Sequence, residues 1–541
     1  MSGNVFLGID VGTGSARAGL FNKQGVLLAS AKHPIRTWYE AGEIVEQSTE
    51  DIWAAVAASI RAAIGQAGIV ASDIAGIGVD ATCSLAVVDQ NGAPVPVGPS
   101  NDAQRNVIVW MDHRATDQTE RINVTGHPVL SYVGGKLSPE MQTPKLLWLK
   151  ENKPESFASA AHFFDLADYL TWRMTGSLAR SVCTVTCKWT YLAHEKRWDE
   201  SYFHSIGLGE LTENAFERIG SKVVAAGTPL AGGLTSQAAL DFGMNAGTPV
   251  GAGLIDAHAG GIGTVGASGL GPLENSLAYI FGTSACAMAT TREPAYVKGI
   301  WGPYYSAMVP DLWLNEAGQS AAGAAIDQLI HMHPASSEAG VLATEGGMSL
   351  VSWLEQQAVM GGSNLSGAAL RARNVHVLPD FLGNRSPNAD PDARAIIAGV
   401  DANRDVSGLV DLYIAGLCGL GYGCRQIIEA LKEQGINITI VVASGGAAQS
   451  ELVRQILADT TGVPVAVPTS SEPVLLGAAI LGSMAAGAFS STSEAMDAMS
   501  RIDKVYHPGG DDIAQYHHSK MQVYRLLQVA DWEMRQLMKP L

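Results

Sequence analysis

The chain has 541 residues, more than a single hydrophobic core usually supports, so we expect at least two domains. Hydrophobic residues make up 47% of the sequence and charged residues 16%, which excludes disorder as its global state. The net charge of −17 excludes a nucleic-acid-binding protein of the usual basic kind, although anionic small ligands remain compatible where loops and a metal ion supply positive charge.

The N-terminal region has an antiparallel pattern. An apolar run at residues 5–10 is followed by a turn-rich segment and by two further strand patterns separated by a turn. A helix is predicted next, because Ser48 or Thr49 can cap it, apolar residues recur at helical spacing, and Gly65 or Gly68 can end it. The region therefore begins as strand, strand, strand, helix rather than as a βαβ unit.

The next predicted elements surround possible ligand positions. Residues 74–80 read as a buried strand with Asp80 at its C-terminal end, where open α/β sheets place ligands. Residues 251–271 carry eight glycines in 21 positions and are expected to form a hinge or a domain boundary. Residues 277–291 then repeat the opening pattern of an apolar strand that runs into a Gly-Thr turn and a second strand. This similarity indicates an internal duplication.

The C-terminal region predicts a second nucleotide-type unit. Residues 412–431 read as a buried helix, and residues 438–443 as a strand that runs into the glycine turn at 444–448. A further strand at 463–468 precedes a helix that starts near Val474. The order strand, glycine turn, helix is typical of phosphate and nucleotide sites.

The cysteine content and the N-terminal sequence indicate the cellular compartment of the protein. The six cysteines have neither the density of a disulfide framework nor CxxC spacing. Cys183 and Cys187 are spaced to share one helical face, but no histidine lies near them in the sequence, so we do not expect a thiolate metal site. The sequence has neither a signal-peptide pattern at residues 1–14 nor a run of 18 apolar residues. We expect a cytoplasmic protein with no membrane partner.

The glycine-rich loop at residues 10–17 is the first candidate site. The carboxylate of Asp10 at a strand end can hold a hydrated divalent metal, and Gly12 lets backbone N–H groups approach a phosphate. Thr13, Ser15 and Arg17 add further donors. An ordinary glycine-rich hairpin explains the same residues, and the loop matches neither a Walker A motif nor a GxGxxG turn.

The second candidate is Asp256, at the end of an apolar run and flanked by glycines. Such a carboxylate suits a general base that must approach a substrate hydroxyl. Alternatively, Asp256 only caps the helix that follows it. Two more glycine turns, Gly282–Ser284 and Ser444–Gly446, complete the set.

In this order, the four segments resemble the FGGY family of carbohydrate kinases, which shares its fold with actin, hexokinase and the heat-shock chaperones. The resemblance extends from Leu7 to about Gly487. Four further segments match motifs of the family: 110–114 (WMDHR), 144–149 (PKLLWL), 379–385 (PDFLGNR) and 315–323 (NEAGQSAAG).

The resemblance implies an α/β fold with two actin-like, ribonuclease H-like ATPase domains flanking a central cleft. Residues 1–270 would form the N-terminal domain, with the sugar site and the first phosphate loop. Residues 271–541 would form the C-terminal domain, with the second phosphate loop and the nucleoside site.

The resemblance also implies ATP and Mg²⁺ as cofactors and assigns a role to individual residues. Asp10 would organise Mg²⁺, and Asp256 would take the proton from the attacking sugar hydroxyl. The phosphate loops would use Gly12, Thr13, Ser15, Arg17, Gly282 and Thr283. The nucleoside would lie at Gly445, Gly446 and Ser450, with Gly323 near the base. The sugar would be bound by Asp80, Thr82, Cys83, Trp110, Asp112, Arg114, Lys188, Asp256 and Glu316. Ser450 stands where relatives often have Asn, and Asp327 where Gln is common.

The segment at residues 82–87 (TCSLAV) bears on the choice of sugar. It is similar to the TCSLV motif of the D-ribulokinase subgroup, and small side chains there leave room for a five-carbon ketose. A buried strand end explains the same residues, with Cys83 as a small hydrophobe. We expect D-ribulose, with L-ribulose, xylulose or ribitol as alternatives.

Two other functions fit parts of the sequence. A non-catalytic ATP switch of the actin and chaperone type would bind nucleotide without turning over a sugar, but it does not need Asp256 beside a sugar-type segment. A dinucleotide-dependent oxidoreductase is disfavoured because no GxGxxG follows the first strand. The expected partners are a small sugar and ATP, with a homodimer as a possible assembly.

Overall fold

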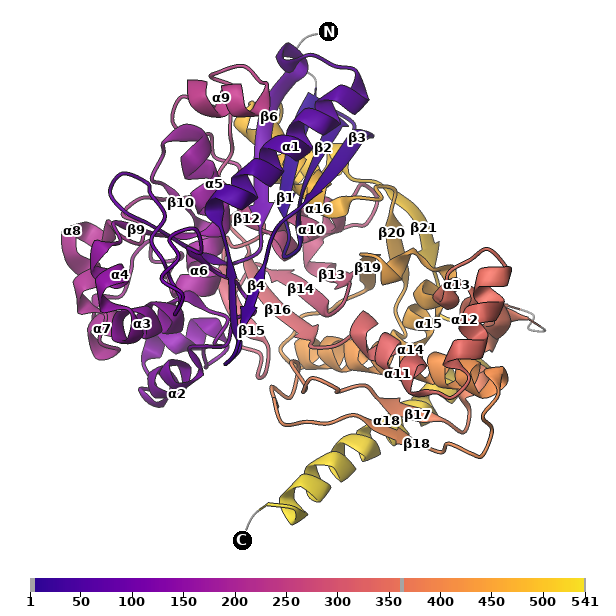
Figure 1. Cartoon of the computed structure of the whole chain (residues 1–541). Coiled ribbons are helices and arrows are strands. Elements are labelled where there is room, and N and C mark those ends of the chain that lie inside the picture. The colour runs from indigo at the N-terminus through magenta and orange to yellow at the C-terminus, as the bar shows by residue number, and fades with distance from the viewer. Residues whose placement is uncertain (1–4, 361–363, 540–541) are drawn as a thin grey trace.

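A five-stranded sheet in the order β12-β6-β1-β2-β3 forms the centre of the first half of the structure, a computed structural model that describes residues 5–360 and 364–539 (Figure 1). β1 pairs antiparallel with β2, and β2 with β3, whereas β6 and β12 are parallel to β1. The antiparallel start predicted from the sequence is therefore present. The strands are β1 (Val5–Val11), β2 (Ser15–Asn22), β3 (Leu27–Pro34), β6 (Ile74–Ala81) and β12 (Leu254–Ile255).

Helix α1 (Thr49–Ala67) packs against β2 and β3, and its ends follow the predicted signals. The side chain of Ser48 accepts a hydrogen bond from the backbone N–H of Asp51 at 3.4 Å. Gly68 ends the helix in the left-handed conformation with φ 64°, which costs glycine little. The cap, the apolar stripe and the glycine are all local features, which is why the sequence predicts this helix well.

The second half repeats the topology of the first around a seven-stranded sheet in the order β15-β16-β14-β13-β19-β20-β21. β13 pairs antiparallel with β14 and parallel with β19, as β1 does with β2 and β6. The internal duplication indicated by the sequence is thus visible in the strand order. The strands are β13 (Ser276–Phe281), β14 (Ala285–Thr291), β15 (Trp301–Tyr305), β16 (Trp313–Gln319), β19 (Ile440–Ser444), β20 (Val465–Pro468) and β21 (Ile502–Tyr506).

Two helices join the halves. α16 (Pro473–Ala485) packs on β1 and β6, although it lies late in the sequence, and α10 (Asp256–Val265) packs against both α16 and β13 (Figure 1). The glycine-rich segment, expected to form a hinge or a domain boundary, contains β12 and α10. Its glycines serve close packing: a Cβ on Gly263 would lie 2.0 Å from the carbonyl oxygen of Pro473, and a Cβ on Gly477 1.9 Å from that of Ala259.

Helix α14 (Val406–Glu433) is the one described helix long and apolar enough to cross a membrane. Of the most apolar 18-residue stretch of this helix, 78% is buried inside the structure. α14 is therefore a core helix of the second half. It packs against α11 (Gly323–Met332) and α15 (Glu451–Thr461). α15 follows β19 across the glycine turn, and the helix that the sequence predicts near Val474 is α16.

A third sheet, in the order β4-β5-β8-β7-β9, and the helices between residues 116 and 242 also belong to the first half. The strands of this sheet are β4 (Trp38–Glu40), β5 (Ile44–Gln47), β8 (Val107–Ile108), β7 (Leu85–Val88) and β9 (His162–Asp165). The helices of this region are α2 (Thr116–Val124), α3 (Gln142–Asn152), α4 (Pro154–Ser159), α5 (Leu166–Thr175), α6 (Val182–Trp189), α7 (Glu200–Ser205), α8 (Glu213–Phe216) and α9 (Ser236–Phe242).

The remaining elements lie at the edges of the two halves. The short strands are β10 (Arg180–Ser181), β11 (Val223–Val224), β17 (His376–Leu378) and β18 (Ile396–Ala398). The helices are α12 (Ser336–Glu345), α13 (Leu350–Val359), α17 (Thr492–Met499) and α18 (Asp511–Leu537). The end of α18 projects from the body of the molecule (Figure 1). Residues 1–4, part of the segment searched for a signal peptide, lie outside the described residues.

Candidate active site between the two halves

A cavity of about 440 Å³ lies between the two halves and brings together the phosphate loops and most of the predicted sugar residues. β1, β2 and the start of α10 contribute from one side, and β13, β14 and β16 from the other. The predicted residues that line it are Asp10, Gly12, Thr13, Ser15, Arg17, Thr82, Cys83, Trp110, Lys188, Asp256, Gly282, Thr283 and Glu316.

Each glycine loop is closed by a backbone hydrogen bond, which spans three residues in the first loop and two in the second. The backbone N–H of Gly12 donates to the carbonyl of Ser15 at 3.1 Å, and that of Gly282 donates to Ser284 at 2.9 Å. A Cβ on Gly14 would meet no atom within 4 Å among the described residues, so this side of the first loop is open. Two such loops facing one cavity can approach opposite sides of a phosphate group.

Thr13 is held in place by two side chains. Its hydroxyl accepts a hydrogen bond from Trp110 Nε1 at 2.9 Å, and its carbonyl accepts one from Gln47 Nε2 at 2.6 Å. The tryptophan of the WMDHR segment therefore links the first phosphate loop to the sugar end of the cavity.

Three carboxyl groups converge at the phosphate end. Asp10 and Asp80 are partners across the parallel pair β1 and β6, and Asp256 begins α10 beside them. Asp80 was expected to bind the sugar, but its side chain is fully buried and does not line the cavity. Neither oxygen of Asp80 has a hydrogen-bond partner among the described residues. Burial raises the pKa of Asp80 well above its usual value, and the charges of Asp10 and Asp256 raise it further. Oxygen ligands in this arrangement suit a hard divalent cation, so the residues present fit the expected Mg²⁺.

Arg17 forms an ion pair with Asp10. Its Nε donates to Asp10 Oδ2 at 2.6 Å, and its Nη1 lies 2.7 Å from Glu472 Oε2. Glu472 directly precedes α16, so Arg17 also ties the first loop to the C-terminal part of the chain. The guanidinium lines the cavity and can donate to a phosphate.

Asp256 is the first residue of α10 and faces the cavity. The N-cap position belongs to Ile255, and no side chain caps the helix, so the capping interpretation is wrong. The role of Asp256 as a base stays a prediction. One carboxyl oxygen accepts a hydrogen bond from the backbone N–H of Ala257 at 2.8 Å. Burial raises the pKa of Asp256 to about 6, with the charge of Asp10 adding to the effect. A carboxyl group with this pKa can accept a proton near neutral pH.

The sugar end of the cavity is lined by charged side chains from both halves. Lys188 comes from α6 and Glu316 from β16. Burial opposes the charge of Lys188, but Cys83 and Glu316 raise its pKa well above the usual value, so it stays protonated. A fixed ammonium and carboxylate facing one cavity can orient the hydroxyl groups of a sugar.

Sequence reasoning gave no role to several residues that also line this end: Glu140, Cys286, Trp301 and Arg385. Glu140 Oε1 lies 3.8 Å from Arg385 Nη2, although the two residues come from different halves. Arg385 ends the PDFLGNR segment, which was the one signal that could have identified it. Glu140 and Trp301 carry no comparable pattern.

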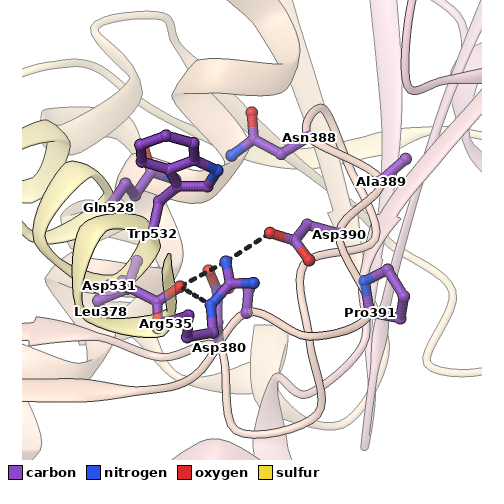
Figure 2. Close-up of a pocket in the computed structure, with 11 residues that line it drawn as sticks. Leu378, Asp380, Asn388, Ala389, Asp390, Pro391, Gln528, Asp531, Trp532 and Arg535 are labelled. Carbon is purple, nitrogen blue, oxygen red and sulfur yellow. Dashed lines mark hydrogen bonds and ion pairs between the residues drawn. The ribbon is translucent and has the colours of Figure 1, made fainter. Parts of the chain in front are cut away.

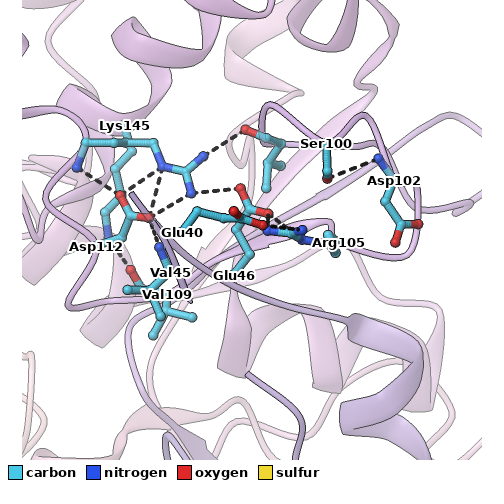
Figure 3. Close-up of polar contacts among 11 residues, drawn as sticks. Glu40, Val45, Glu46, Ser100, Asp102, Arg105, Val109, Asp112 and Lys145 are labelled. Carbon is cyan, nitrogen blue, oxygen red and sulfur yellow. Dashed lines mark hydrogen bonds and ion pairs between the residues drawn. The ribbon is translucent and has the colours of Figure 1, made fainter. Parts of the chain in front are cut away.

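Asp112 and Arg114 were expected to bind the sugar, but they lie behind the cavity wall in a buried ion-pair network. Arg114 Nη2 lies 2.7 Å from Asp112 Oδ2 and 2.9 Å from Glu46 Oε1. Asp112 also accepts from the backbone N–H of Val45 at 2.6 Å, and Figure 3 shows Glu46 engaging Arg105 on its other side. These residues hold the segment that carries Trp110. Their spacing in the sequence identified the motif but not the direction of the side chains.

A second cavity, of about 480 Å³, contains the predicted nucleoside residues Gly323, Gly446 and Ser450, together with Asp327. It adjoins the first cavity, because the backbone N–H of Gly323 donates to the carbonyl of Gly282 in the second phosphate loop at 3.0 Å. A Cβ on Gly323 would lie 2.9 Å from that oxygen, so a larger residue would press on the loop.

Gly445 lies beneath this cavity rather than at its surface. Its φ is 92°, and a Cβ there would lie 2.6 Å from the carbonyl oxygen of Phe281. The turn after β19 therefore needs glycine to pack against the end of β13. Gly445 supports the nucleoside site without lining it.

A third cavity, of about 430 Å³, lies under α18 and away from the predicted site residues (Figure 2). Arg535 bridges Asp390 at 2.5 Å and Asp531 at 2.9 Å across its mouth. The internal pairing of its charged groups argues for a structural role.

Comparisons with known proteins agree with this geometry. The model of the FGGY family of carbohydrate kinases, N-terminal domain, matches residues 5–263, and that of the C-terminal domain matches residues 277–486. A human FGGY carbohydrate kinase domain-containing protein is 45% identical over 96% of this chain and 95% of its own length. A protein named D-ribulokinase from Saccharomyces cerevisiae is 36% identical over 90% of this chain and 73% of its own length.

Solved structures share the fold at lower identity. A ligand-bound xylulose kinase from Lactobacillus acidophilus has a TM-score of 0.79 at 19% identity and covers 97% of this chain and 98% of its own. A Plasmodium falciparum glycerol kinase with ADP has a TM-score of 0.75 at 17% identity and covers 99% of both chains. The two family models together match most of the sequence, and the chain therefore belongs to the FGGY family of carbohydrate kinases.

Proposed function

We propose that this carbohydrate kinase transfers the γ-phosphoryl group of ATP to a hydroxyl group of a pentulose, with D-ribulose as the preferred substrate. The observation that carries the proposal is the position of Asp256, a half-buried carboxyl group in the same cavity as both predicted phosphate loops and the charged sugar end. A protein that only binds and releases nucleotide has no need for a base at this point.

Asp256 accepts the proton of the attacking hydroxyl as the new bond to phosphorus forms. Lys188 and Glu316 orient the sugar so that this hydroxyl faces the phosphate end of the cavity. Phosphoryl transfer depends mainly on such positioning and on stabilising charge. The hydrogen bond from Ala257 N–H leaves the second oxygen of Asp256 available for the proton.

The phosphate groups lie between the two glycine loops in this proposal. Gly12, Thr13 and Ser15 contact them from one side, Gly282 and Thr283 from the other, and Arg17 adds a positive charge. Asp10 and Asp80 would hold Mg²⁺, which neutralises the charge of the β- and γ-phosphates when it is bound. The unpartnered oxygens of Asp80 support this role.

The nucleoside occupies the second cavity, beside Gly323, Gly446 and Ser450. The hydrogen bond between Gly323 and Gly282 supports this assignment, because it sets the base site directly beside the second phosphate loop. The glycerol kinase of the same fold contains ADP, which agrees with a nucleotide in this cleft.

The choice of D-ribulose rests on the segment that contains Thr82 and Cys83, both of which line the sugar end, and on the yeast relative named D-ribulokinase. L-ribulose, xylulose and ribitol are the alternatives. The deciding experiment is an ADP-release assay with a panel of pentuloses, pentitols and glycerol. We expect the highest kcat/KM for D-ribulose. A higher value for another pentulose would overturn the substrate, and ATP binding without sugar-dependent ADP release would overturn the function.

A further inference from the structure

A buried cluster of two thiols and an imidazole lies behind the sugar end of the cavity. Cys183 and Cys187 lie on α6, and His258 lies on α10. The two sulfur atoms and a ring nitrogen all lie within 4.8 Å of one another, and all three residues are buried. Cys183 Sγ is 3.0 Å from His258 Nδ1. None of the three has a role in the proposed phosphoryl transfer.

The geometry of Cys183 and Cys187 favours a metal ion bound by both thiolates over a disulfide bond between them. Residues four apart on a helix have Cβ atoms about 5–6 Å apart, whereas a disulfide needs Cβ atoms roughly 3.5–4.5 Å apart. Cys183 and Cys187 would have to unwind α6 to form that bond. A metal ion with sulfur bonds of about 2.3 Å can bridge the two thiolates without such a change.

The opposite side of the imidazole has the partner that a metal-binding histidine usually has. His258 Nε2 lies 3.4 Å from Glu316 Oε2. A histidine that ligates a metal commonly donates its other ring N–H to a carboxylate, which fixes the tautomer and raises the basicity of the ligating nitrogen. Glu316 would thus leave Nδ1, the nitrogen nearest Cys183, free to bind.

We propose that Cys183, Cys187 and His258 form a binding site for a thiophilic cation, and that this cation is Zn²⁺. The site is separate from the expected Mg²⁺ position at Asp10, where every donor is a carboxylate oxygen. Thiolate and imidazole select Zn²⁺ over Mg²⁺. The sequence pointed away from such a site, because His258 is 75 residues from Cys183 and only the fold brings them together.

The pKa values of the three residues are shifted by one another. Burial alone would raise the pKa of Cys183, but its hydrogen bond with Cys187 and the charge of His258 lower it below the usual value. Burial and the neighbouring Cys183 raise the pKa of Cys187 well above its usual value. Burial would lower the pKa of His258, but Cys183 and Glu316 raise it to about 10.

Binding of Zn²⁺ would displace the protons that the thiol groups and His258 Nδ1 carry, because the ion binds thiolates and neutral imidazole. Two thiolates then balance the charge of the ion, and the neutral imidazole keeps its hydrogen bond from Nε2 to Glu316. The ion would hold α6 and α10 together, and through Glu316 it would link them to β16 of the other half. The inference does not depend on which sugar the enzyme phosphorylates.

The test uses the full chain, freed of metal with a chelator and titrated with Co²⁺, whose visible spectrum reports tetrahedral thiolate ligation. We expect one equivalent of Co²⁺ to give thiolate charge-transfer and d–d bands that Zn²⁺ abolishes and Mg²⁺ does not. Proton release should accompany binding, and the affinity should therefore rise with pH. A wild-type chain with no thiolate band would overturn the site.

Matched variants separate this cluster from the other buried thiols. Cys187→Ser should lose the thiolate bands, whereas Cys418→Ser, which changes a buried thiol on α14, should keep them. Bands that survive Cys187→Ser unchanged would overturn the assignment. If Cys187→Ser does not fold, X-ray absorption of the Zn²⁺-loaded wild type decides. Sulfur ligands at about 2.3 Å with a nitrogen ligand at about 2.0 Å support the site, and oxygen and nitrogen ligands alone contradict it.

Discussion

Asp10 on β1 and Asp80 on β6 are direct partners across a parallel strand pair, and the charge of Asp10 helps to hold the pKa of Asp80 well above its usual value. Two carboxyl groups in this arrangement repel each other when both are ionised. A divalent cation bound here would relieve that repulsion and would give a partner to the oxygens of Asp80, which have none among the described residues.

Removal of the first of these carboxylates should therefore abolish the metal dependence of the reaction. We expect Asp10→Asn to lower Mg²⁺-dependent phosphoryl transfer by at least about 100-fold, since a metal ion at a transferring phosphoryl group contributes several kcal/mol. ADP release measured across a Mg²⁺ titration tests this. An unchanged Mg²⁺ dependence would mean that the first glycine loop has only a structural role.

The raised pKa of Asp256 predicts an acidic limb in the pH profile. A general base works only when deprotonated, and the pKa of Asp256 is about 6. As the pH falls below that value, kcat/KM should fall about tenfold per pH unit, whereas above it kcat/KM should level off. A profile that is flat down to pH 4.5 in a folded enzyme would contradict this role.

The substrate choice is tested at Cys83, which lines the sugar end of the cavity. We expect Cys83→Leu to lower kcat/KM for D-ribulose by roughly 10–200-fold while the KM for ATP changes little, because a misfit of one or two methylene groups costs about 1–3 kcal/mol in a pocket.

Cys424→Leu serves as the control for added volume at a buried thiol away from the cleft. It should lower the melting temperature through overpacking without changing the order of preference among pentuloses. If Cys83→Leu behaves in the same way, Cys83 is a core residue and the choice of sugar loses its physical support.

Arg114 is expected to matter for stability rather than for sugar contact. Arg114→Ala leaves the buried carboxylates of Asp112 and Glu46 without their shared partner, and breaking a buried ion pair costs about 3–5 kcal/mol. Urea denaturation measures the loss of unfolding free energy. A fully stable Arg114→Ala protein with a raised KM for the sugar would restore the role in sugar binding that the sequence motif implied.

The sequence predicted those parts of the fold whose signals are local. Ser48 and Gly68 mark the ends of α1 within the chain itself, and the glycine loops at Gly12 and Gly282 follow apolar strands directly. The position of Asp256 at the end of a strand is likewise indicated by the residues that flank it. Each of these predictions needs only a short stretch of chain.

Features that depend on segments far apart in the sequence were missed or misread. Glu140 and Arg385 meet across the cleft, and His258 completes a cluster with two cysteines from another helix. The glycines of α10 looked like those of a hinge, because nothing nearby in the sequence shows that α16 packs against them. Asp112 illustrates a second limit of prediction from sequence, because a motif gives the spacing of residues but not the direction of their side chains.

The most direct test of the central claim is turnover by Asp256→Asn, a nearly isosteric change that removes the proposed base. Asp380→Asn is the matched control, because burial also raises the pKa of Asp380 to about 6 but its side chain lies in the cavity under α18 (Figure 2). The account predicts that Asp256→Asn still binds ATP and loses roughly 10²–10⁴-fold in kcat, while Asp380→Asn keeps its turnover. Near-normal kcat in a folded Asp256→Asn protein would contradict it.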